Sequence, residues 1–410
     1  MTKEKVIPQI RFSGFTDTWE QRKLGEVVKE VTRNDSTSEA PIMMITANNG
    51  FIEQSERYAF NNAGESLKKY ILLEKGELAY NHGASKLRPY GSCFALTTAE
   101  NARIPFVYHC FSVENQNAEF MSIELNSSEI ENQLRKIVSS GARMDGLLNI
   151  SFDEYSSVSV VLPSIEEQDR IAGFLRNLDR LITLHQRKYD KLTKVKKAML
   201  EKMFPENGSP YPEIRFKGFT DAWEQRKLSA IADKVTEKNV GLQYIETFTN
   251  SAEFGIISQR DFFDHDIAKM SSLGGYYIVR SEDFVYNPRI STSAPVGPIN
   301  RNKLGRIGVM SPLYTVFRPH DIDTTYLEYF FKSKYWHSFM NFNGDSGARS
   351  DRFSIKDSVF FEMPIPIPHI DEQKKIGEYL AYLDRLITLH QRKLEKLKNI
   401  KKACLEKMFV

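Results

Sequence analysis

The stretch LDRLITLHQRK occurs twice in the chain, at Leu178–Lys188 and again at Leu383–Lys393. The two copies are identical over eleven residues and lie 205 positions apart in a chain of 410 residues. A repeat at such a long and fixed offset is typical of a duplicated structural unit. The extent of this repeat therefore decides how the whole chain is organised.

The duplication covers almost the whole chain. The segment IRFSGFTDTWEQRKL (Ile10–Leu24) returns at Ile214–Leu228 with 13 of 15 positions identical, and Glu166–Phe204 returns at Asp371–Phe409 with 25 of 39 identical. The sequence predicts an α+β fold, a tandem duplication of one α+β domain followed by a long helix. We expect the first domain at 1–163, its helix at 164–204, a linker at 205–213, the second domain at 214–368 and its helix at 369–410.

Each repeated C-terminal segment has the apolar spacing of a long helix. From Ile376 to Leu397, apolar residues and one histidine follow one another at steps of four and three, which is a heptad seam. About 39 residues at 1.5 Å per residue correspond to a rod of roughly 58 Å. Because a heptad seam needs a partner, we expect the two helices to pair as an antiparallel coiled coil with pseudo-two-fold symmetry. The alternative is that each helix packs only on its own domain.

His185 and His390 lie at the midpoints of the two repeated segments. In an antiparallel pair in register they would face each other on the seam, where a polar pair can fix the register at some cost in stability. The alternative places both imidazoles in water at the edge of the seam. The same symmetry predicts that the two ends of the chain lie close together.

The divergent middle parts mix short β-rich runs with turns. KYILLEKGELAYN and RIGVMSPLYTVFRP are typical of strands, and longer amphipathic helices are expected at Ala118–Val138 and Thr324–Phe342, the second with a Thr cap. Trp19 and Trp223 are expected to anchor each domain by packing, although a contact with a partner protein is the alternative.

Charge and composition narrow the classes of function. The net charge is +3, and each repeated segment has ten Lys and Arg against six Asp and Glu, so the remainder carries 3 − 8 = −5. The basic helix faces could contact DNA or an acidic partner, or could simply be solvated. We expect a cytoplasmic protein without a membrane segment, because the start has no apolar signal and no apolar run reaches about 18 residues.

The usual motifs of catalysis and metal binding do not occur. Cys93, Cys110 and Cys404 lack CxxC spacing and are interpreted as reduced thiols. There is no GxxxxGK(S/T) phosphate loop and no HExxH, and the nearest approach to an (N/D)PP(Y/F) methyltransferase motif is YNPR at Tyr286–Arg289. We therefore expect a chain that is not an enzyme.

Two loops share a frame but differ in their contents. YNHGASKLRPYG (Tyr80–Gly91) and YNPRISTSAPVG (Tyr286–Gly297) match at Tyr, Asn, Pro and Gly. Amide, guanidinium and hydroxyl groups read base edges, so these loops are candidates for DNA contact, with ordinary polar turns as the alternative. The candidate residues are Asn81, His82, Ser85, Lys86 and Arg88 in the first loop, and Asn287, Arg289, Ser291, Thr292 and Ser293 in the second.

A second pair of candidates follows from the repeated SGAR stretch. It places Arg143 and Arg349 directly after a small, flexible turn. Backbone N–H groups together with an arginine suit a DNA phosphate. A structural arginine that binds a helix end is the alternative.

The order of these motifs resembles the specificity (S) subunit of type I restriction-modification systems over essentially the whole chain. The likeness rests on FTDTWEQRKLGEV and FTDAWEQRKLSAI, on LPSIEEQDRIAGFL and IPHIDEQKKIGEYL, on the paired SGAR stretches and on the duplication. It implies that each middle part is a target-recognition domain that reads one half of a split DNA site. The helices would then set the gap and dock two methyltransferase subunits, and restriction subunits would join this core.

The same resemblance implies that the chain binds no cofactor itself. S-adenosylmethionine, ATP and Mg²⁺ would belong to the partner subunits, which carry adenine methylation and DNA cleavage. Two other classes of function stay open from the residues alone. One is a pseudo-symmetric protein adaptor without a DNA role, and the other is a methyltransferase or nuclease that acts alone.

Overall fold

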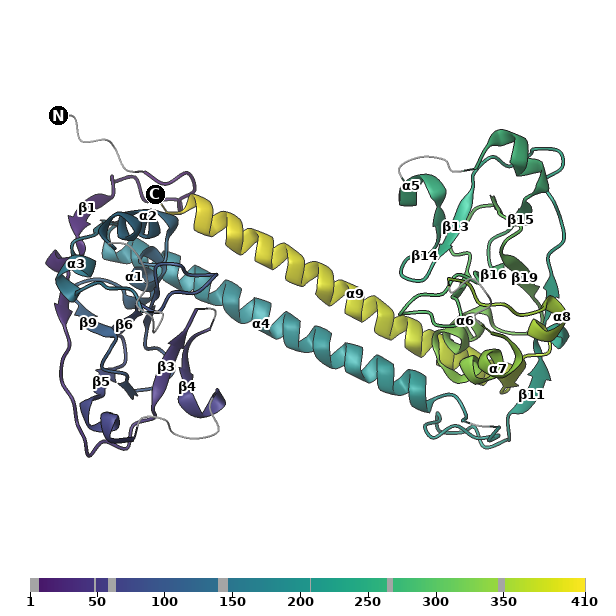
Figure 1. Cartoon of the computed structure of the whole chain (residues 1–410), viewed down its shortest axis with the longest axis horizontal. Coiled ribbons are helices and arrows are strands. Elements are labelled where there is room, and N and C mark those ends of the chain that lie inside the picture. The colour runs from purple at the N-terminus through teal and green to yellow at the C-terminus, as the bar shows by residue number, and fades with distance from the viewer. Residues whose placement is uncertain are drawn as a thin grey trace. The chain divides into compact units, whose positions relative to one another are not determined.

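The computed structural model describes residues 7–47, 49–57, 64–138, 147–206, 208–263, 268–345 and 351–409. The chain divides into two compact units. The first unit contains Met1–Leu184 and Lys393–Val410, and the second contains His185–Arg392. Each unit therefore consists of one mixed α and β domain together with part of both long helices (Figure 1).

The first domain is built around a four-stranded antiparallel sheet in the order β2-β9-β6-β7. Three further antiparallel pairs, β1–β10, β3–β4 and β5–β8, flank this sheet. The strands are β1 (Glu20–Lys23), β2 (Val28–Glu30), β3 (Met43–Thr46), β4 (Gly50–Glu53), β5 (Ile71–Glu74), β6 (Leu78–Asn81), β7 (Ser92–Ala95), β8 (Asn101–Ile104), β9 (His109–Val113) and β10 (Ser159–Leu162). The helices are α1 (Ala118–Glu124), α2 (Ser128–Ile137) and α3 (Phe152–Ser156), with 3-10 turns at Leu24–Glu26, Gln54–Glu56 and Gly64–Lys69.

The second domain repeats this topology strand for strand. Its four-stranded sheet has the order β12-β19-β16-β17, and its pairs are β11–β20, β13–β14 and β15–β18. The strands are β11 (Glu224–Lys227), β12 (Ala232–Lys234), β13 (Phe248–Ser251), β14 (Gly255–Ser258), β15 (Tyr277–Val279), β16 (Phe284–Tyr286), β17 (Ile299–Arg301), β18 (Gly308–Met310), β19 (Thr315–Pro319) and β20 (Pro364–Ile367). The helices are α5 (Gln259–Phe263), α6 (Thr324–Lys332), α7 (Tyr335–Asn343) and α8 (Asp357–Phe360), with 3-10 turns at Leu228–Ala230 and Met270–Gly275.

The predicted helix at Thr324–Phe342 is wrong as a single element. The structure breaks it at Ser333, whose backbone is extended, so that α6 ends at Lys332 and α7 begins at Tyr335. The Ser333 hydroxyl and the Ser333 backbone amide both donate to the Phe330 carbonyl, which satisfies this acceptor at the helix end. The cap of α6 is Asp323 and not the expected threonine. The counterpart at Ala118–Val138 is likewise split into α1 and α2.

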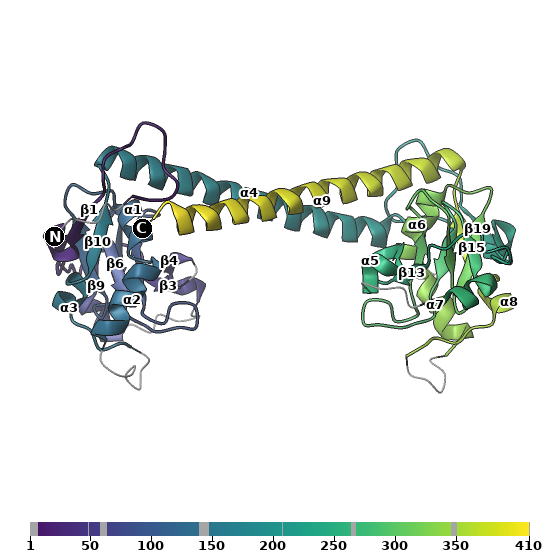
Figure 2. The ribbon, with the colours of Figure 1, turned by 90° about the horizontal axis from the view of Figure 1, so that it is seen from above.

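The long helices are α4 (Ile165–Lys202) and α9 (Ile370–Lys407). In the first unit, the early part of α4 packs against the late part of α9, where Cys404 and Met408 share one core with Leu175 and Leu178 (Figure 1). In the second unit, the late part of α4 packs against the early part of α9 (Figure 2). The predicted antiparallel pairing is confirmed in each unit.

The two histidines of the repeat contact each other. Nδ1 of His185 lies 2.8 Å from Nδ1 of His390, and the ring centroids are 5.1 Å apart. Both rings are half-buried. This confirms the predicted seam pair. The contact is a hydrogen bond when one Nδ1 carries a proton and the other does not.

The repeated signature residues hold each domain to its long helix. Arg11 binds both carboxylate oxygens of Glu167 at 2.7 Å, and Arg215 binds both oxygens of Glu372 at 2.7 and 2.8 Å. The two glutamates are almost fully buried. A buried charge needs a partner of this kind, because desolvation penalises an unpaired carboxylate. The fold therefore explains why both halves have an arginine and a glutamate at these positions.

Each half also begins on the end of a long helix. The Ile10 amide donates to the Lys407 carbonyl at 2.9 Å, and the Ile214 amide donates to the Lys202 carbonyl at 2.8 Å. The first contact lies within the first unit and joins the segment at Ile10 to the end of α9, which supports the expectation that the two ends of the chain lie close together. Trp19 and Trp223 are both 3% exposed, which confirms that they anchor by packing. In the part of the chain that the structure describes, no helix is both long and apolar enough to cross a bilayer.

Candidate nucleic-acid interface

The two candidate loops leave equivalent strands of the two sheets. The first joins β6 to β7 and the second joins β16 to β17, and both sheets place these strands side by side. Each loop is closed by a tyrosine hydroxyl. Tyr80 donates to the Tyr90 carbonyl at 2.6 Å, and Tyr286 donates to the Val296 carbonyl at 2.9 Å. The common frame predicted from the sequence is therefore present in both domains.

A glycine closes each loop for a steric reason. Gly91 and Gly297 have φ values of 83° and 84°, which side chains rarely adopt. A Cβ atom would lie 2.6 Å from the Asn81 carbonyl oxygen at Gly91 and 2.2 Å from the Asn287 carbonyl oxygen at Gly297. The loop ends approach so closely that no other residue fits without movement of the backbone.

The frame asparagines shape the loops. The Asn81 amide donates to the Ile45 carbonyl at 3.1 Å, and its oxygen accepts from the Gly83 amide at 2.9 Å. The Asn287 amide donates to the Asn250 carbonyl at 2.8 Å, and its oxygen accepts from the Arg289 amide at 2.9 Å. Both ends of each side-chain amide thus have partners inside the domain. DNA contact by these two residues stays a prediction, and a purely structural role inside the loop is the alternative.

His82 is buried beneath the first loop. Its ring nitrogens lie 2.8 Å from the Leu148 carbonyl and 2.5 Å from the Val107 carbonyl. The ring stacks on His109 at 5.2 Å between centroids. Burial lowers the pKa of His109, because the charged imidazolium is penalised away from water. His82 therefore supports the loop from inside and does not present a nitrogen to solvent.

The loop tips carry the exposed polar groups. Ser85 and Ser291 each accept a backbone amide of their own turn, from Arg88 at 3.0 Å and from Ala294 at 3.2 Å. Arg88 is half-buried and donates to the Asn126 carbonyl at 2.8 Å. The remaining candidates are exposed on the surface of the tips: Lys86, Arg289, Thr292 and Ser293.

Arg143 and Arg349 lie outside the described residues, so their predicted phosphate contacts stay predictions. The residues that follow each SGAR stretch pair with the candidate loops. Leu147 forms a bridge with Gly83, and Arg352 forms a bridge with Arg289. The described residues that follow each SGAR stretch are thus adjacent to the candidate loop of the same domain.

Arg352 was missed by the sequence analysis. It lines a cavity of about 490 Å³ beside the second loop, together with Lys234, Tyr277 and Tyr314. Aromatic faces stack on bases and cations bind phosphate, so this lining suits a nucleotide. Lys234 forms an ion pair with Asp357, which raises the pKa of the lysine. The equivalent of Arg352 in the first half is Leu147, so no repeated signal could have marked it.

Metal ligands are not gathered in the described part of the chain. Among those residues, no three His, Cys, Asp or Glu side chains lie close enough to hold an ion. The three cysteines are free and buried. Burial raises the pKa of Cys93 to about 12, so its thiol stays protonated at neutral pH.

The chain was compared with known proteins. The model of a family described as type I restriction modification DNA specificity domain matches residues 16–194 and 221–399. The type I restriction enzyme MjaVIII specificity subunit of Methanocaldococcus jannaschii is 24% identical over 297 residues, which cover 69% of this chain and 67% of that protein. The putative type I restriction enzyme MjaX specificity subunit of the same organism is 22% identical over 437 residues, covering 98% and 95%.

A solved structure has the same fold. The S subunit of a type I restriction-modification system from M. genitalium aligns over 99% of both chains, with a TM-score of 0.50 and 12% identity. The tandem α+β architecture predicted from the repeat is thereby confirmed.

Proposed function

Since the chain belongs to the family of type I restriction modification DNA specificity domains and contains that domain twice, we propose that it supplies the DNA sequence specificity of a type I restriction-modification complex. Each domain reads one half of a split DNA site. The observation that carries this proposal is the pair of loops at Tyr80–Gly91 and Tyr286–Gly297, which have one closed frame and different exposed tips. A constant frame with exchanged contents is what two readers of different half-sites require.

The long helices give the complex its spacing and its docking sites. The surface of Leu178–Lys188 is repeated without change at Leu383–Lys393, so the chain presents the same side chains twice. Two copies of one partner can bind two such surfaces, and we propose two methyltransferase subunits as these partners. Restriction subunits would join the assembly through this core, with double-stranded DNA held by the two domains.

The chemistry of the complex is assigned to the partner subunits. Adenine methylation with S-adenosylmethionine, and cleavage driven by ATP with Mg²⁺, would occur there and not in this chain. The repeated residues with strong polar contacts support this division, because Arg11, Glu167, Arg215 and Glu372 are engaged in holding the fold. A pseudo-symmetric adaptor without DNA contact is the competing function.

Mapping of methylated adenines across the genome tests the proposal. Cells that contain the partner subunits are compared with and without this chain. We expect a motif with two defined halves and a fixed gap that disappears when the chain is deleted. An unchanged set of methylated adenines would contradict the proposal. The competing adaptor also predicts no sequence-specific component when the purified complex is titrated with DNA at several salt concentrations.

A further inference from the structure

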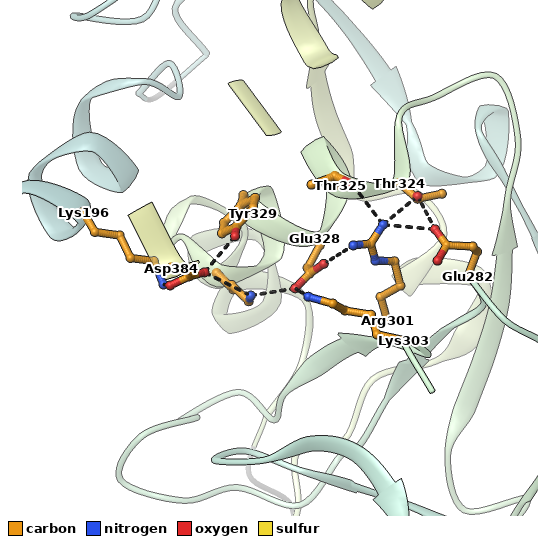
Figure 3. A network of polar contacts seen from close by, with 10 residues as sticks. Lys196, Glu282, Arg301, Lys303, Thr324, Thr325, Glu328, Tyr329 and Asp384 are labelled. Carbon is orange, nitrogen blue, oxygen red and sulfur yellow. Dashed lines mark hydrogen bonds and ion pairs between the residues drawn. The ribbon is translucent and has the colours of Figure 1, made fainter. Parts of the chain in front are cut away.

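A network of charged side chains lies in the second unit (Figure 3). We call the region of Glu282, Arg301, Lys303, Glu328 and Lys332 the corner. Arg301 of β17 pairs with Glu282 at 3.0 Å and with Glu328 of α6 at 2.6 Å. Lys303 and Lys332 also bind the Glu328 carboxylate, at 3.2 and 2.6 Å. Glu328 is nearly buried, and its pKa is lowered, because the three neighbouring cations outweigh the opposing effect of desolvation. The corner is therefore occupied by charged groups that form ion pairs with one another.

The same network reaches the long helices. The Tyr329 hydroxyl of α6 donates to Oδ2 of Asp384 on α9 at 2.7 Å (Figure 3). Lys196 of α4 pairs with the other oxygen of Asp384. The ammonium of Lys332 lies 4.6 Å from the centre of the Tyr329 ring. The Tyr329 phenol and the Lys332 ammonium group thus cover the face of the Asp384 carboxylate that is turned toward the second domain.

The helical part of this corner is repeated in the first unit. Asp179 and Lys401 stand 205 positions from Asp384 and Lys196 within the duplicated segments. They form the same ion pair, with 2.5 Å between Lys401 Nζ and Asp179 Oδ1. The carboxylate that accepts the Tyr329 hydroxyl in one half is therefore present in the other.

The register of α1 against α6 follows from their caps. The Asn117 and Asp323 side chains each accept the amide three residues later, from Phe120 and from Tyr326. The backbone amides of both caps donate to equivalent glutamines of the long helices, Gln168 and Gln373. Positions in the two helices therefore correspond at an offset of 206.

At this offset the first half lacks the groups that fill the corner. Tyr329 corresponds to Ile123, and Lys332 corresponds to Asn126. Asn126 is turned inward and donates to the Ser122 carbonyl at 2.7 Å. Neither residue can supply a phenol hydroxyl or an ammonium group to Asp179.

Strand β7 of the first half likewise lacks the cations that β17 and the residues after it supply in the second half. Arg301 pairs with Phe284 across β16 and β17, and Ala95 pairs with Leu78 at the same place across β6 and β7. Arg301 therefore corresponds to Ala95, and two residues further on Lys303 corresponds to Thr97. Two long cations have been replaced by two short side chains.

A cavity of about 680 Å³ lies where these replacements meet in the first unit. This volume falls within the range of ligand sites, roughly 300–1,000 Å³. Apolar groups of Phe94, Leu175 and Phe409 form part of its wall. All of the substituted positions and the retained ion pair are among its lining residues: Ala95, Thr97, Ile123, Asn126, Asp179 and Lys401.

We propose that this cavity binds a small aromatic cation, a ring that carries an ammonium or guanidinium group. The second half shows which chemistry the corner accepts, because a phenol and a lysine occupy it there. The first half lacks three cations and two carboxylates of the second, because Gly76 and Ser122 stand in place of Glu282 and Glu328, a change of −3 + 2 = −1 in charge. Its remaining charged lining groups sum to 3 − 4 = −1, namely Arg88, Arg176 and Lys401 against Glu119, Glu129, Asp179 and Glu406.

The ligand would use contacts that the second half already displays. Its ring would lie between the apolar wall and Ile123, and its cation or hydroxyl would contact the Asp179 carboxylate. The cavity shares Arg88 with the first candidate loop, but the proposed ligand contacts do not involve Arg88 and do not depend on the proposed DNA function. Its test is therefore independent of any methylation readout.

Calorimetric titration of the full chain with tyramine tests the proposal. Tyramine carries both a phenol and an ammonium group, and a ligand of this size is expected to bind at one site with a Kd of about 1 mM or lower. The variant Ile123→Tyr restores the side chain of the second half and should remove the binding. The variant Thr97→Lys, at an exposed position, adds a cation at the rim and should weaken binding about tenfold without disturbing the core.

Two comparisons make the result specific. Asp384→Asn changes the equivalent carboxylate in the filled corner and should leave tyramine affinity as in the parent chain, whereas Asp179→Asn should reduce it about tenfold. 2-Phenylethanol, which lacks the cation, should bind more weakly than tyramine. Absence of saturable binding up to about 10 mM would overturn the proposal. Binding that is unchanged in both Ile123→Tyr and Thr97→Lys would overturn it as well.

Discussion

At the scale of single residues, Glu124 shows how the two halves solve one problem differently. Its carboxyl group is buried on α1 and accepts the Val161 amide of β10 at 3.2 Å. The equivalent of Val161 in the second domain is Pro366, because each faces the glutamine of the paired strand. Proline has no N–H, so no acceptor is needed there. The corresponding position of α6 is the apolar Phe330.

Burial raises the pKa of Glu124 to about 7, although the bond from Val161 opposes the shift. Between the ordinary carboxyl range and pH 7, the folded first unit holds a proton that the unfolded chain has lost. Its free energy of unfolding should therefore fall as the pH rises through this window. Glu124→Gln keeps an acceptor without a charge, so it should remove this fall and stabilise the unit at about pH 8 by up to about 3 kcal/mol.

Urea unfolding at about pH 5 and pH 8 measures the effect. Glu114→Gln, at an exposed position of the same domain, is the matched control and should retain the parent slope. A Glu124→Gln chain that still loses stability between the two pH values would show that another group is responsible.

Arg289 carries the prediction for base recognition in the second domain. It is exposed at the loop tip, while the neighbouring Asn287 is held inside the frame. Arg289→Ala should relax recognition at one base position and cost about 1–3 kcal/mol there, while the other half of the motif is unaffected. Competition binding with oligonucleotides varied at each position measures this. A uniform loss over all sequences, with a salt slope reduced by about one, would instead assign Arg289 to a phosphate.

The candidate site could be predicted from the sequence only in part. The matching loop frames predicted from the sequence are present in both domains, because Tyr and Gly have fixed roles in closing each loop, while DNA contact by these loops stays a prediction. The direction of each side chain could not be predicted, since it depends on strands distant in sequence. Asn81, for example, is bound by Ile45, and His82 is bound by Val107 and Leu148.

At the scale of elements, the heptad spacing predicted the long helices and their antiparallel pairing. The shorter helices were less predictable. The apolar pattern of Thr324–Phe342 continues across Ser333, yet the hydroxyl of Ser333 binds the Phe330 carbonyl and ends α6. Such local competition between a side chain and the helix ladder leaves no periodic signal in the sequence.

The histidine pair predicts how the paired helices respond to acid. His185 and His390 share one hydrogen bond through Nδ1, which needs one ring without a proton at that atom. Acidification from about pH 8 to about pH 5 protonates imidazoles, and two charged rings repel each other. The melting temperature should therefore fall over this range, more than in the double variant His185→Leu/His390→Leu.

The double variant should also be more stable at neutral pH, by about 1–2 kcal/mol, because two half-buried polar rings become apolar. Thermal unfolding followed by circular dichroism measures both effects. The single variants His185→Leu and His390→Leu serve as controls. Each keeps one imidazole on the seam but removes the hydrogen bond between the two rings. Equal acid sensitivity in the parent and the double variant would contradict a role for the pair.

At the scale of the whole molecule, the duplication makes the two domains interchangeable parts. The clamps Arg11–Glu167 and Arg215–Glu372 lie outside the divergent segments, and both cap residues meet an equivalent glutamine. A chimera in which residues 25–163 are replaced by residues 229–368 should therefore fold. Its methylated motif should contain the half-site of the second domain twice, with the gap unchanged.

The same chimera separates the two proposals, because the transplanted domain brings its own Tyr329, Lys332 and Arg301 to the corner beside Asp179. Those groups fill the place of the cavity, so the chimera should no longer bind tyramine while it gains the doubled DNA motif. The reverse chimera, with two copies of the first domain, should bind two molecules of tyramine and read the other half-site twice. Methylome mapping and calorimetry measure these outcomes separately. A doubled motif that depended on bound tyramine would contradict the independence of the two sites.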